Sequence, residues 1–362
     1  MGGMPRRPRN DAPGRRHHVV NRATGRRPFF DVKRDYLFMQ SLLEEAVDAG
    51  RILVLAYSLM GTHYHILLES LDGNLSRTMR WIQSKYVAQF NRTRERVGAL
   101  VQGRFFSQPV QTLAYLLIVL RYIDLNPVVP RVCTDPFAYP YGSAMYQVEE
   151  TPSVKWLSRT LIDPLLDPLL QSGLSRPDAY RRLFRLDLDL PGASRLVESR
   201  LEHPSREADC LDDLFCAHGS DWLEWFRRRA LEADGTALGL PTADADSILD
   251  AVAHKKPCAP LATMPARRGR PRSLWDVAVT GLLRDLGGLT YTAISRRTGV
   301  SVSHAKKRHL AHLDAIQTDE IYGSLVVEVA VDALERCFGP IVRIVADQIA
   351  RSQLRKKGEK MV

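Results

Sequence analysis

The 362-residue chain lacks the long apolar runs that mark membrane-spanning proteins. A membrane helix needs about 18 or more consecutive apolar residues, and the richest apolar run, from Tyr115 to Leu120, is much shorter. Residues 1–16 are rich in arginine but contain no apolar segment of the kind that a signal peptide requires. We therefore expect no membrane partner and no secretion signal.

Cysteine is also scarce, and its pattern excludes a disulfide scaffold. The five cysteines are scattered and include no C-x-x-C pair, which argues for a reducing, cytoplasmic location. Cys210, Cys216 and His218 are close enough in sequence to suggest a corner of a zinc site. Their spacing fits no standard zinc motif and no second ligand pair follows, so the sequence does not favour zinc.

Acidic residues are outnumbered, with 41 Asp and Glu against 51 Lys and Arg and a net charge of +10. The excess lies in three segments: eight arginines within residues 1–30, a turn-rich run around residues 267–272, and residues 289–310, which contain no acid. Such clustering favours a polyanionic partner, and residues 1–16 are expected to be a basic arm. If the polyanionic partner is DNA, the protein would be associated with the nucleoid. The shifts in charge predict domains over residues 1–150, 151–264 and 265–350, with a basic tail over 351–362.

The first predicted domain alternates strand and helix signals. Residues 54–60 are typical of a buried strand, and residues 63–70 of a partner strand after a turn at Gly61-Thr62. Apolar residues at helical spacing predict a helix from about residue 75 to 94. A further helix is expected from about residue 112 until Asn126-Pro127, because a proline disfavours helix in the residue before it. The region 151–264 is expected to be helical.

Two histidines on the second strand form the first chemical feature. His63 and His65 are two residues apart, and such positions share one face of a strand, so both imidazoles can converge on one divalent ion. Tyr64 between them would point into the core. The alternative is that the two histidines are unrelated side chains of a half-buried strand.

The second chemical feature is a tyrosine on the last helix of this domain. Tyr122 and Asn126 are four residues apart and lie on one helix face. A tyrosine oxygen can attack phosphorus as a covalent nucleophile, although its ordinary pKa of about 10 means that it needs a metal ion or nearby cations. Asn126 could add a carbonyl oxygen as a third metal ligand. Alternatively, Tyr115 and Tyr122, seven residues apart, could belong to a core stripe.

Seven short blocks appear in an order that resembles a known family. They are Pro13-Gly14 with His18-Val19 and Asn21-Arg22; AYSLMGTHYHILLE; Gly73 to Arg77; Tyr86 with Phe90-Asn91-Arg92; Gly98 with Gln102-Gly103-Arg104-Phe105; Tyr115-Leu116-Leu117 with RYIDLNPV; and Tyr139 to Ser143. With these blocks the first ~146 residues resemble the REP-associated tyrosine transposases, the single-tyrosine branch of the HUH nucleases.

The resemblance implies an α+β fold, with a small antiparallel HUH (ferredoxin-like) sheet and flanking helices. It implies that His63 and His65 bind a divalent metal ion, Mg²⁺ or Mn²⁺, with Asn126 as a weaker third ligand. It implies that Tyr122 cleaves single-stranded hairpin DNA from repeated palindromes, leaving a 5′-phosphotyrosine link and a free 3′-hydroxyl, and that strand transfer reverses this step. Tyr86 takes a packing role in this comparison.

The chain departs from the family pattern at several positions. Gly61-Thr62 replace the usual Pro-Asn, and Asp124 stands where a histidine is common. An acid at position 124 points elsewhere on the helix but could disfavour a nearby phosphate. These departures support an alternative function, a DNA-binding regulator that uses the same fold without chemistry.

The third basic segment is typical of a helix-turn-helix. A helix over residues 274–286, a short helix, a turn at Gly299 and a further helix resemble the helix-turn-helix domain of bacterial replication initiators and regulators. The last helix would face duplex DNA, with His304, His309 and His312 at its surface or on phosphates; the alternative is a three-helix module that serves only packing. The DNA-binding candidates of the whole chain are Arg15, Arg16, Arg22, Arg104, Arg296, Arg297, Ser303, Lys306, Lys307 and Arg308.

Overall fold

The chain divides into two compact units in the computed structural model, one comprising Met1–Leu188 and Val197–Asp209, the other Asp189–Leu196 and Cys210–Val362. The structure describes residues 11–25, 27–184, 186, 191–202, 243–257, 263–264 and 272–339. No helix among these residues is long and apolar enough to cross a membrane. The domain boundaries expected at residues 150, 264 and 350 stay predictions.

Several predicted features lie outside the described residues. They are the arginines at 6, 7, 9 and 26, the suggested zinc corner of Cys210, Cys216 and His218, the basic residues Arg267, Arg268 and Arg270, residues 203–242 of the middle region, and the tail 351–362.

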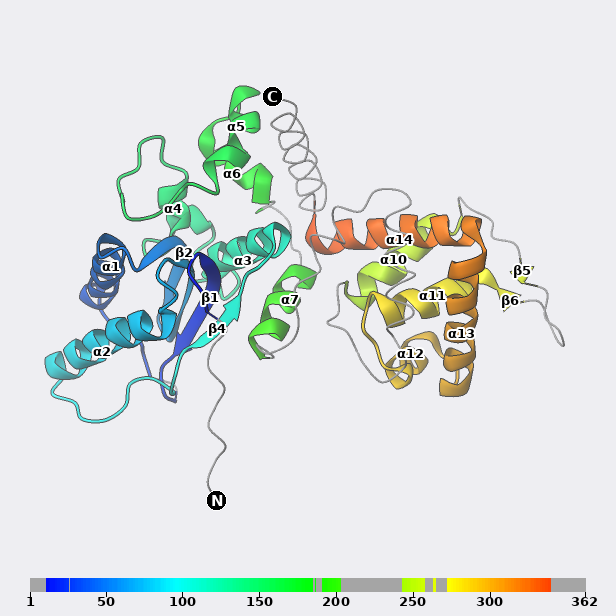
Figure 1. Ribbon diagram of the computed structural model, residues 1–362, viewed down its shortest axis with the longest axis horizontal. Coiled ribbons are helices and arrows are strands. Elements are labelled where there is room, and N and C mark those ends of the chain that lie inside the picture. Colours follow the sequence, from blue (N-terminus) through cyan, green and yellow to red (C-terminus); the bar gives the residue numbers. More distant parts are fainter. Residues whose placement is uncertain are drawn as a thin grey trace, which may run out of the picture. The chain divides into compact units, whose positions relative to one another are not determined.

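An antiparallel four-stranded sheet forms the centre of the first unit, with the strand order β2-β3-β1-β4 (Figure 1). The strands are β1 (Arg15–Arg22), β2 (Ile52–Met60), β3 (His63–Ser70) and β4 (Phe106–Pro109). Together with its helices this sheet confirms the predicted α+β fold. The expected basic arm is wrong for residues 15 and 16, because they begin β1, which pairs with β3 over residues 15–22 and with β4 over residues 17–20.

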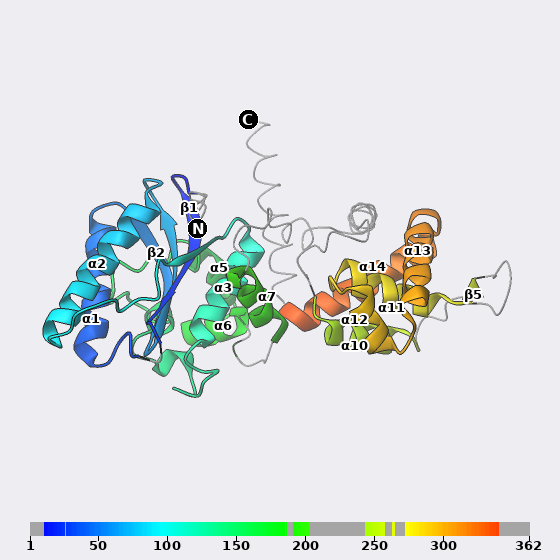
Figure 2. The same cartoon turned by 90° about the horizontal axis from the view of Figure 1, so that it is seen from below.

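Helices cover both faces of this sheet (Figures 1 and 2). One face carries α1 (Lys33–Asp48) and α2 (Leu75–Thr93), and α3 (Leu113–Leu125) packs against β2 and β3 on the other. The strands predicted over 54–60 and 63–70 and the helices predicted over 75–94 and 112–126 are therefore confirmed, with small differences at their ends.

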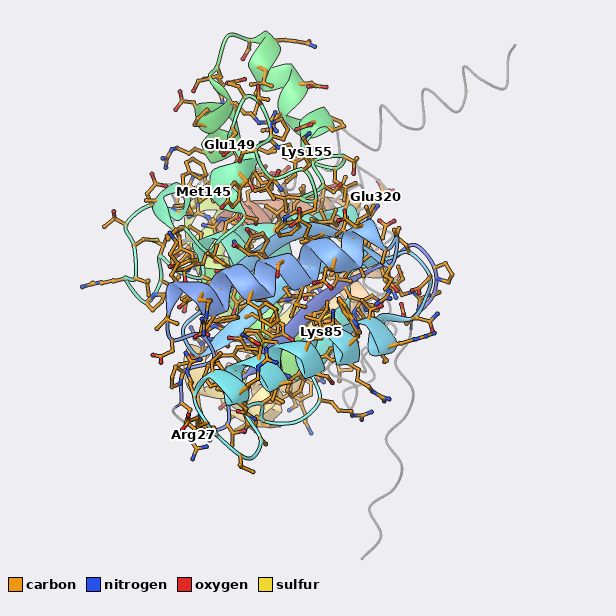
Figure 3. The ribbon with its side chains drawn as sticks, turned by 90° about the vertical axis from the view of Figure 1, so that its left-hand side faces the viewer. Arg27, Lys85, Met145, Glu149, Lys155 and Glu320 are labelled. Carbon is orange, nitrogen blue, oxygen red and sulfur yellow. The ribbon has the colours of Figure 1, made fainter. Side chains whose placement is uncertain are left out.

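The main core lies between the sheet and the pair α1 and α2. Tyr64, Ile66 and Leu68 alternate along β3 and are fully buried in this core, as the two-residue period of a strand requires. Tyr64 points into the core as predicted, and its hydroxyl accepts a hydrogen bond from Gln83 at 2.6 Å. Figure 3 looks onto the two helices, where Lys85 on α2 forms an ion pair of 2.9 Å with Glu45 on α1.

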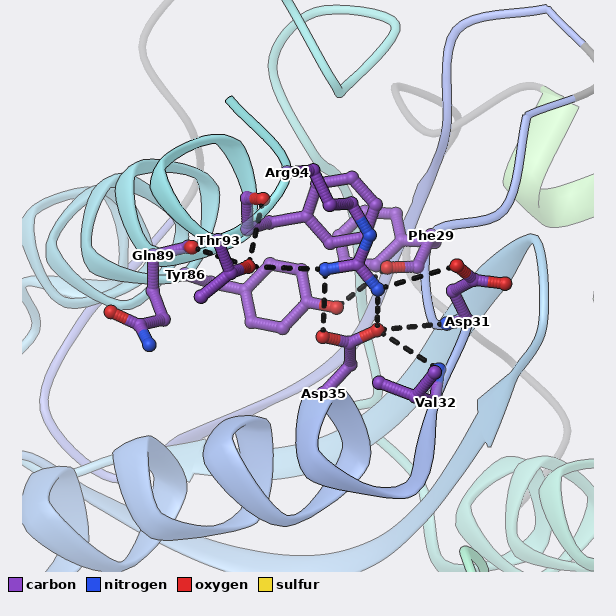
Figure 4. A network of polar contacts seen from close by, with 9 residues as sticks. Phe29, Asp31, Val32, Asp35, Tyr86, Gln89, Thr93 and Arg94 are labelled. Carbon is purple, nitrogen blue, oxygen red and sulfur yellow. Dashed lines mark hydrogen bonds and ion pairs between the residues drawn. The ribbon is translucent and has the colours of Figure 1, made fainter. Parts of the chain in front are cut away.

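A polar network joins the end of α2 to the start of α1 (Figure 4). Arg94 donates to Asp35 at 2.6 Å, and Asp35 accepts from the backbone nitrogens of residues 31 and 32. Tyr86 is buried beside this network and donates to the carbonyl oxygen of Phe29 at 2.5 Å. Tyr86 therefore has the packing environment that the family resemblance implied.

Short helices follow the sheet in the first unit. They are the 3-10 helix at Pro136–Ala138, α4 (Ala144–Gln147), α5 (Asp163–Gln171) and α6 (Arg176–Phe184). Helix α7 (Pro191–Glu202) comes next, and the division between the units falls within it.

The second unit is built mainly from helices. They are α10 (Ala245–Lys255), α11 (Leu274–Asp285), α12 (Tyr291–Thr298), α13 (Val302–Thr318) and α14 (Glu320–Phe338), with a two-stranded ribbon of β5 (Thr263–Met264) and β6 (Arg272–Ser273). Gly299 ends α12 with a φ of 73°, a left-handed conformation that favours glycine. The predicted order of helix, short helix, turn at Gly299 and helix is confirmed, whereas DNA binding by it stays a prediction.

Candidate active site

The pairing of β1 with β3 places polar side chains from both strands on the α3 face of the sheet. In this register Val20 pairs with His65 and Arg22 with His63. The rings of His63 and His65 have their centroids 5.1 Å apart and are nearly perpendicular. The two histidines therefore project from the same face, as the alternation of a strand predicts.

Helix α3 brings Tyr122 and Asn126 to the same place. The ring of Tyr122 lies against His65, with 5.4 Å between their centroids and an edge-on geometry. One turn further, Asn126 Oδ1 is 3.2 Å from His63 Nε2. Asn126 also forms a side-chain hydrogen bond with Tyr122. The four residues that the sequence predicted as nucleophile and ligands are thus in contact with one another.

A cavity of about 720 Å³ opens above these side chains. It is lined by Val20, Arg22, Ala23, Gly25, Thr62, His63, His65, Phe106, Tyr122, Glu198 and Leu201. The exposed Arg22 places a cation beside the histidines and Tyr122.

Burial sets the protonation of the site. It lowers the pKa of His63, and it lowers the pKa of His65 far more, so both imidazoles are neutral at pH 7 and have a lone pair for a metal ion. Burial, with a smaller contribution from Glu198, raises the pKa of Tyr122 to about 12, against opposing effects of Asn126 and Arg22. Tyr122 is therefore a protonated phenol at pH 7 and needs added positive charge to become a nucleophile.

A third histidine, His18, belongs to the site, although the sequence did not predict a functional role for it. It is fully buried on β1, where its Nε2 is 3.0 Å from Nδ1 of His65 and its ring lies 6.1 Å from that of Tyr122. Burial lowers the pKa of His18 to about 3, so its ring is neutral. The signal was present in the His18-Val19 block, but only strand pairing shows which histidine it contacts.

The donor set fits a divalent cation. The hydroxyl of Thr62 holds His63 through Nδ1 at 3.0 Å, and His18 holds His65 through Nδ1, which leaves Nε2 of both rings as ligand atoms. Two ligands of one ion lie about 3 Å apart when each is about 2.1 Å from it at a right angle, close to the separation between His63 Nε2 and Asn126 Oδ1. Among the described residues, no group of three or more His, Cys, Asp or Glu side chains could hold a metal ion. The third donor at this site would therefore be the amide oxygen of Asn126, beside the two histidines.

Asp124 lies on the opposite side of α3 and does not face the cavity. It is buried, and Oδ2 accepts a hydrogen bond of 2.7 Å from the hydroxyl of Tyr180 on α6. Burial raises the pKa of Asp124 to about 7, although this hydrogen bond acts in the opposite direction. Asp124 thus points elsewhere on the helix, as predicted, with its carboxyl group turned toward α6; its effect on a phosphate at Tyr122 stays a prediction.

The DNA-binding candidates of the first unit differ in their surroundings. Arg22 and Arg104 are exposed, whereas Arg15 and Arg16 are half-buried, and Arg16 forms an ion pair of 3.1 Å with Glu69 across the sheet. Of this group, the exposed pair offers the more accessible charges to a phosphate backbone.

In the second unit the candidates lie on α12 and α13. The exposed ones are Arg296, Arg297, Ser303, Lys306 and Lys307, and Arg308 is half-buried. Arg297 forms an ion pair with Asp246, and Arg308 forms one of 2.7 Å with Asp276.

The expected surface role of the α13 histidines is wrong for two of the three. His304 is exposed, but His309 and His312 are fully buried and both contact the carboxylate of Asp285, at 3.0 Å and 3.2 Å. The spacing of three residues places both histidines on the inner face of the helix. The basic residues around them in the sequence had indicated a surface position instead.

Comparison with known proteins finds similarity in the first unit. Residues 14–126 match the family described as "Transposase IS200 like", and no curated protein matches the chain. A solved structure described as "Structure of the REP associates tyrosine transposase bound to a REP hairpin" is similar at 17% identity, covering 40% of this chain and 86% of that chain with a TM-score of 0.35. The family match includes His63, His65, Tyr122 and Asn126. Residues 14–126 are thus similar to the IS200-like transposases, in agreement with the resemblance that the sequence motifs indicated.

Proposed function

We propose that this protein is a metal-dependent endonuclease and strand transferase that acts on single-stranded hairpin DNA through Tyr122. The observation that carries the proposal is the placement of Tyr122 against His65, in one cavity with His63 and Arg22. A regulator that only bound DNA would have no need for a tyrosine beside two neutral histidines.

The reaction we propose is a transesterification. The hydroxyl oxygen of Tyr122 attacks phosphorus and the bond from phosphorus to the 3′ oxygen breaks. The phenol loses its proton and the leaving 3′ oxygen gains one, so the products are a 5′-phosphotyrosine and a free 3′-hydroxyl. The number of phosphate ester bonds is unchanged, and the reverse attack by a 3′-hydroxyl rejoins strands.

His63 and His65 would hold the divalent ion, with Asn126 supplying an amide oxygen. When bound, Mg²⁺ or Mn²⁺ would polarise the phosphate and offset its charge. Arg22 adds a second positive charge at the cavity, and the Asn126 hydrogen bond orients the hydroxyl of Tyr122.

The second unit would add affinity for duplex DNA. Ser301 is the N-cap of helix α13, and its side chain accepts a hydrogen bond from the backbone nitrogen of His304. Lys306 and Lys307 are exposed on the outer face of this helix. A recognition helix of a helix-turn-helix presents its early residues to the major groove in this way. The exposed Arg296 on α12 would contact the phosphate backbone.

The test compares two tyrosines on one substrate. A labelled hairpin oligonucleotide with single-stranded flanks is incubated with Mg²⁺ or Mn²⁺, and the covalent adduct is resolved on a denaturing gel. Tyr122→Phe should abolish the adduct and keep binding, whereas the matched control Tyr86→Phe should form it. Tight binding with no cleavage by the unchanged protein would overturn the enzyme proposal and favour a non-catalytic regulator.

A further inference from the structure

A second cavity, of about 580 Å³, lies on the other face of the sheet from the candidate active site. Its walls are α2 and the segment before β4: Ser76, Arg80, Gln83, Ser84, Val87 and Ala88 on the helix, and Val101, Gly103, Arg104 and Phe105 opposite them. The volume lies within the range of small-molecule sites, roughly 300–1,000 Å³.

The walls of this cavity combine apolar surface with positive charge. Val87, Ala88 and the buried Phe105 supply apolar contacts, and the exposed Arg80 and Arg104 supply two guanidinium groups. Neither arginine has an ion-pair partner among the residues that the structure describes. Apolar walls with two uncompensated cations suit a flat apolar ring joined to an anion, which is the chemistry of a nucleotide.

The segment that forms one wall also reaches the active site. Phe105, directly before β4, lines the second cavity, whereas Phe106, the first residue of β4 and 49% exposed, lines the cavity of Tyr122. Strand β4 has only four residues and forms the edge of the sheet. A DNA strand could therefore pass from one cavity to the other around this edge without crossing the sheet.

We propose that the cavity between α2 and residues 101–105 binds one nucleotide of the strand that Tyr122 cleaves. The base would pack on Val87, Ala88 and Phe105, and its phosphate would contact Arg80 and Arg104. The inference rests on the proposed function in that single-stranded DNA enters the active site, but the subsite contributes to binding rather than to chemistry.

Two variants test the subsite in a Tyr122→Phe background, where no cleavage occurs. Arg80→Ala/Arg104→Ala removes the charges, and Ala88→Trp fills the apolar part; Arg77→Ala, an exposed arginine of the same helix outside the cavity, is the matched control. Affinity for the flanked hairpin is measured by fluorescence anisotropy at several salt concentrations. Stacking of one base contributes about 5- to 150-fold in affinity, so Ala88→Trp should weaken binding at least about fivefold. The double variant should lower the salt slope by about 0.7, as expected for one phosphate of a single strand.

An abasic scan identifies the nucleotide. Removing the base that occupies the cavity should weaken binding to the parent protein but not to Ala88→Trp, because that variant has already lost the contact. A scan in which every abasic position costs the same in both proteins would overturn the proposal. Loss of hairpin binding on addition of micromolar free deoxynucleoside monophosphate would also overturn the proposal, because it would assign the cavity to a free nucleotide. If the unchanged protein forms no covalent adduct but these binding differences are observed, the proposed chemistry is refuted and the proposed subsite is not.

Discussion

The buried carboxylate of Asp285 should dominate the stability of the helices around α13. Its two oxygens contact His309 and His312, the other nitrogen of His309 is 2.9 Å from the hydroxyl of Tyr291, and that of His312 is 2.7 Å from the hydroxyl of Tyr322. One carboxylate thus ties together α11, α12, α13 and α14. Removing one partner of a buried charged pair costs about 3–5 kcal/mol, and Asp285→Asn should destabilise the second unit by this amount.

A matched control is available on the same helix. Asp276 forms an ion pair with Arg308, but 47% of its side chain is exposed, and pairs of this kind contribute about 0–1 kcal/mol. Asp276→Asn should therefore have little effect. Gly281→Ala is a second perturbation of the same cluster, because a Cβ there would lie 2.3 Å from the ring of His312 and must displace it.

The dependence of stability on pH distinguishes the loss of this charge from a simple loss of packing. Burial by itself raises the pKa of Asp285, but the hydrogen bonds from His309 and His312 outweigh it and lower the pKa to about 2, from an ordinary value of 3.8. Between pH 4 and 2 the folded protein therefore binds fewer protons on this group than the unfolded chain, and stability falls as the pH is lowered. The contribution lost is about 2 kcal/mol, and Asp285→Asn should not show it.

Hydrogen exchange followed by mass spectrometry on the full-length protein measures both effects. Peptides from α11 and α13 should lose protection by a factor of about 10² or more in Asp285→Asn, while those from the first unit and those of Asp276→Asn keep theirs. Equal protection in Asp285→Asn and Asp276→Asn would refute the reasoning, because it would mean that the buried contacts have no net effect.

Two further predictions concern the first unit. His18→Phe should weaken Mn²⁺ binding by about tenfold or more in titration calorimetry, because His65 loses the partner that fixes its ring nitrogen; unchanged affinity in a normally folded variant would remove His18 from the site. Tyr180→Phe should destabilise the first unit to urea by about 1–3 kcal/mol, since Asp124 loses its only hydrogen-bond donor among the described residues. Arg182→Ala, a change at an exposed position of the same helix, should change the stability by no more than about 0.5 kcal/mol. Equal midpoints for these two variants would contradict the second prediction.

The sequence predicted those parts of the site that one element determines. His63 with His65, and Tyr122 with Asn126, each share a face through the local period of a strand or a helix, so spacing alone was sufficient. The family resemblance joined the two elements. By contrast, the contact between His18 and His65 depends on strand register, which no local pattern reveals.

Burial explains the remaining errors. The residues near His309 and His312 are basic and polar, so their position on the inner face could not be read from charge alone. Asp124 could be placed away from Tyr122 by helix geometry, but its partner Tyr180 is 56 residues away in sequence. Pairings of this kind depend on how α3 and α6 pack, and neither helix encodes that packing by itself.

The back of α3 has a consequence for exchanging parts between related proteins. Arg121 donates to the carbonyl oxygen of Phe184 at 3.0 Å, and Asp124 accepts from Tyr180, yet both partners lie beyond residues 14–126 that match the family. Helix α3, which carries Tyr122, thus packs against a segment that lies outside the residues matching the family. A chimera that replaces residues 14–126 alone would leave the hydroxyl of Tyr180 and the carbonyl oxygen of Phe184 without these partners, so the smallest exchangeable piece extends through α6.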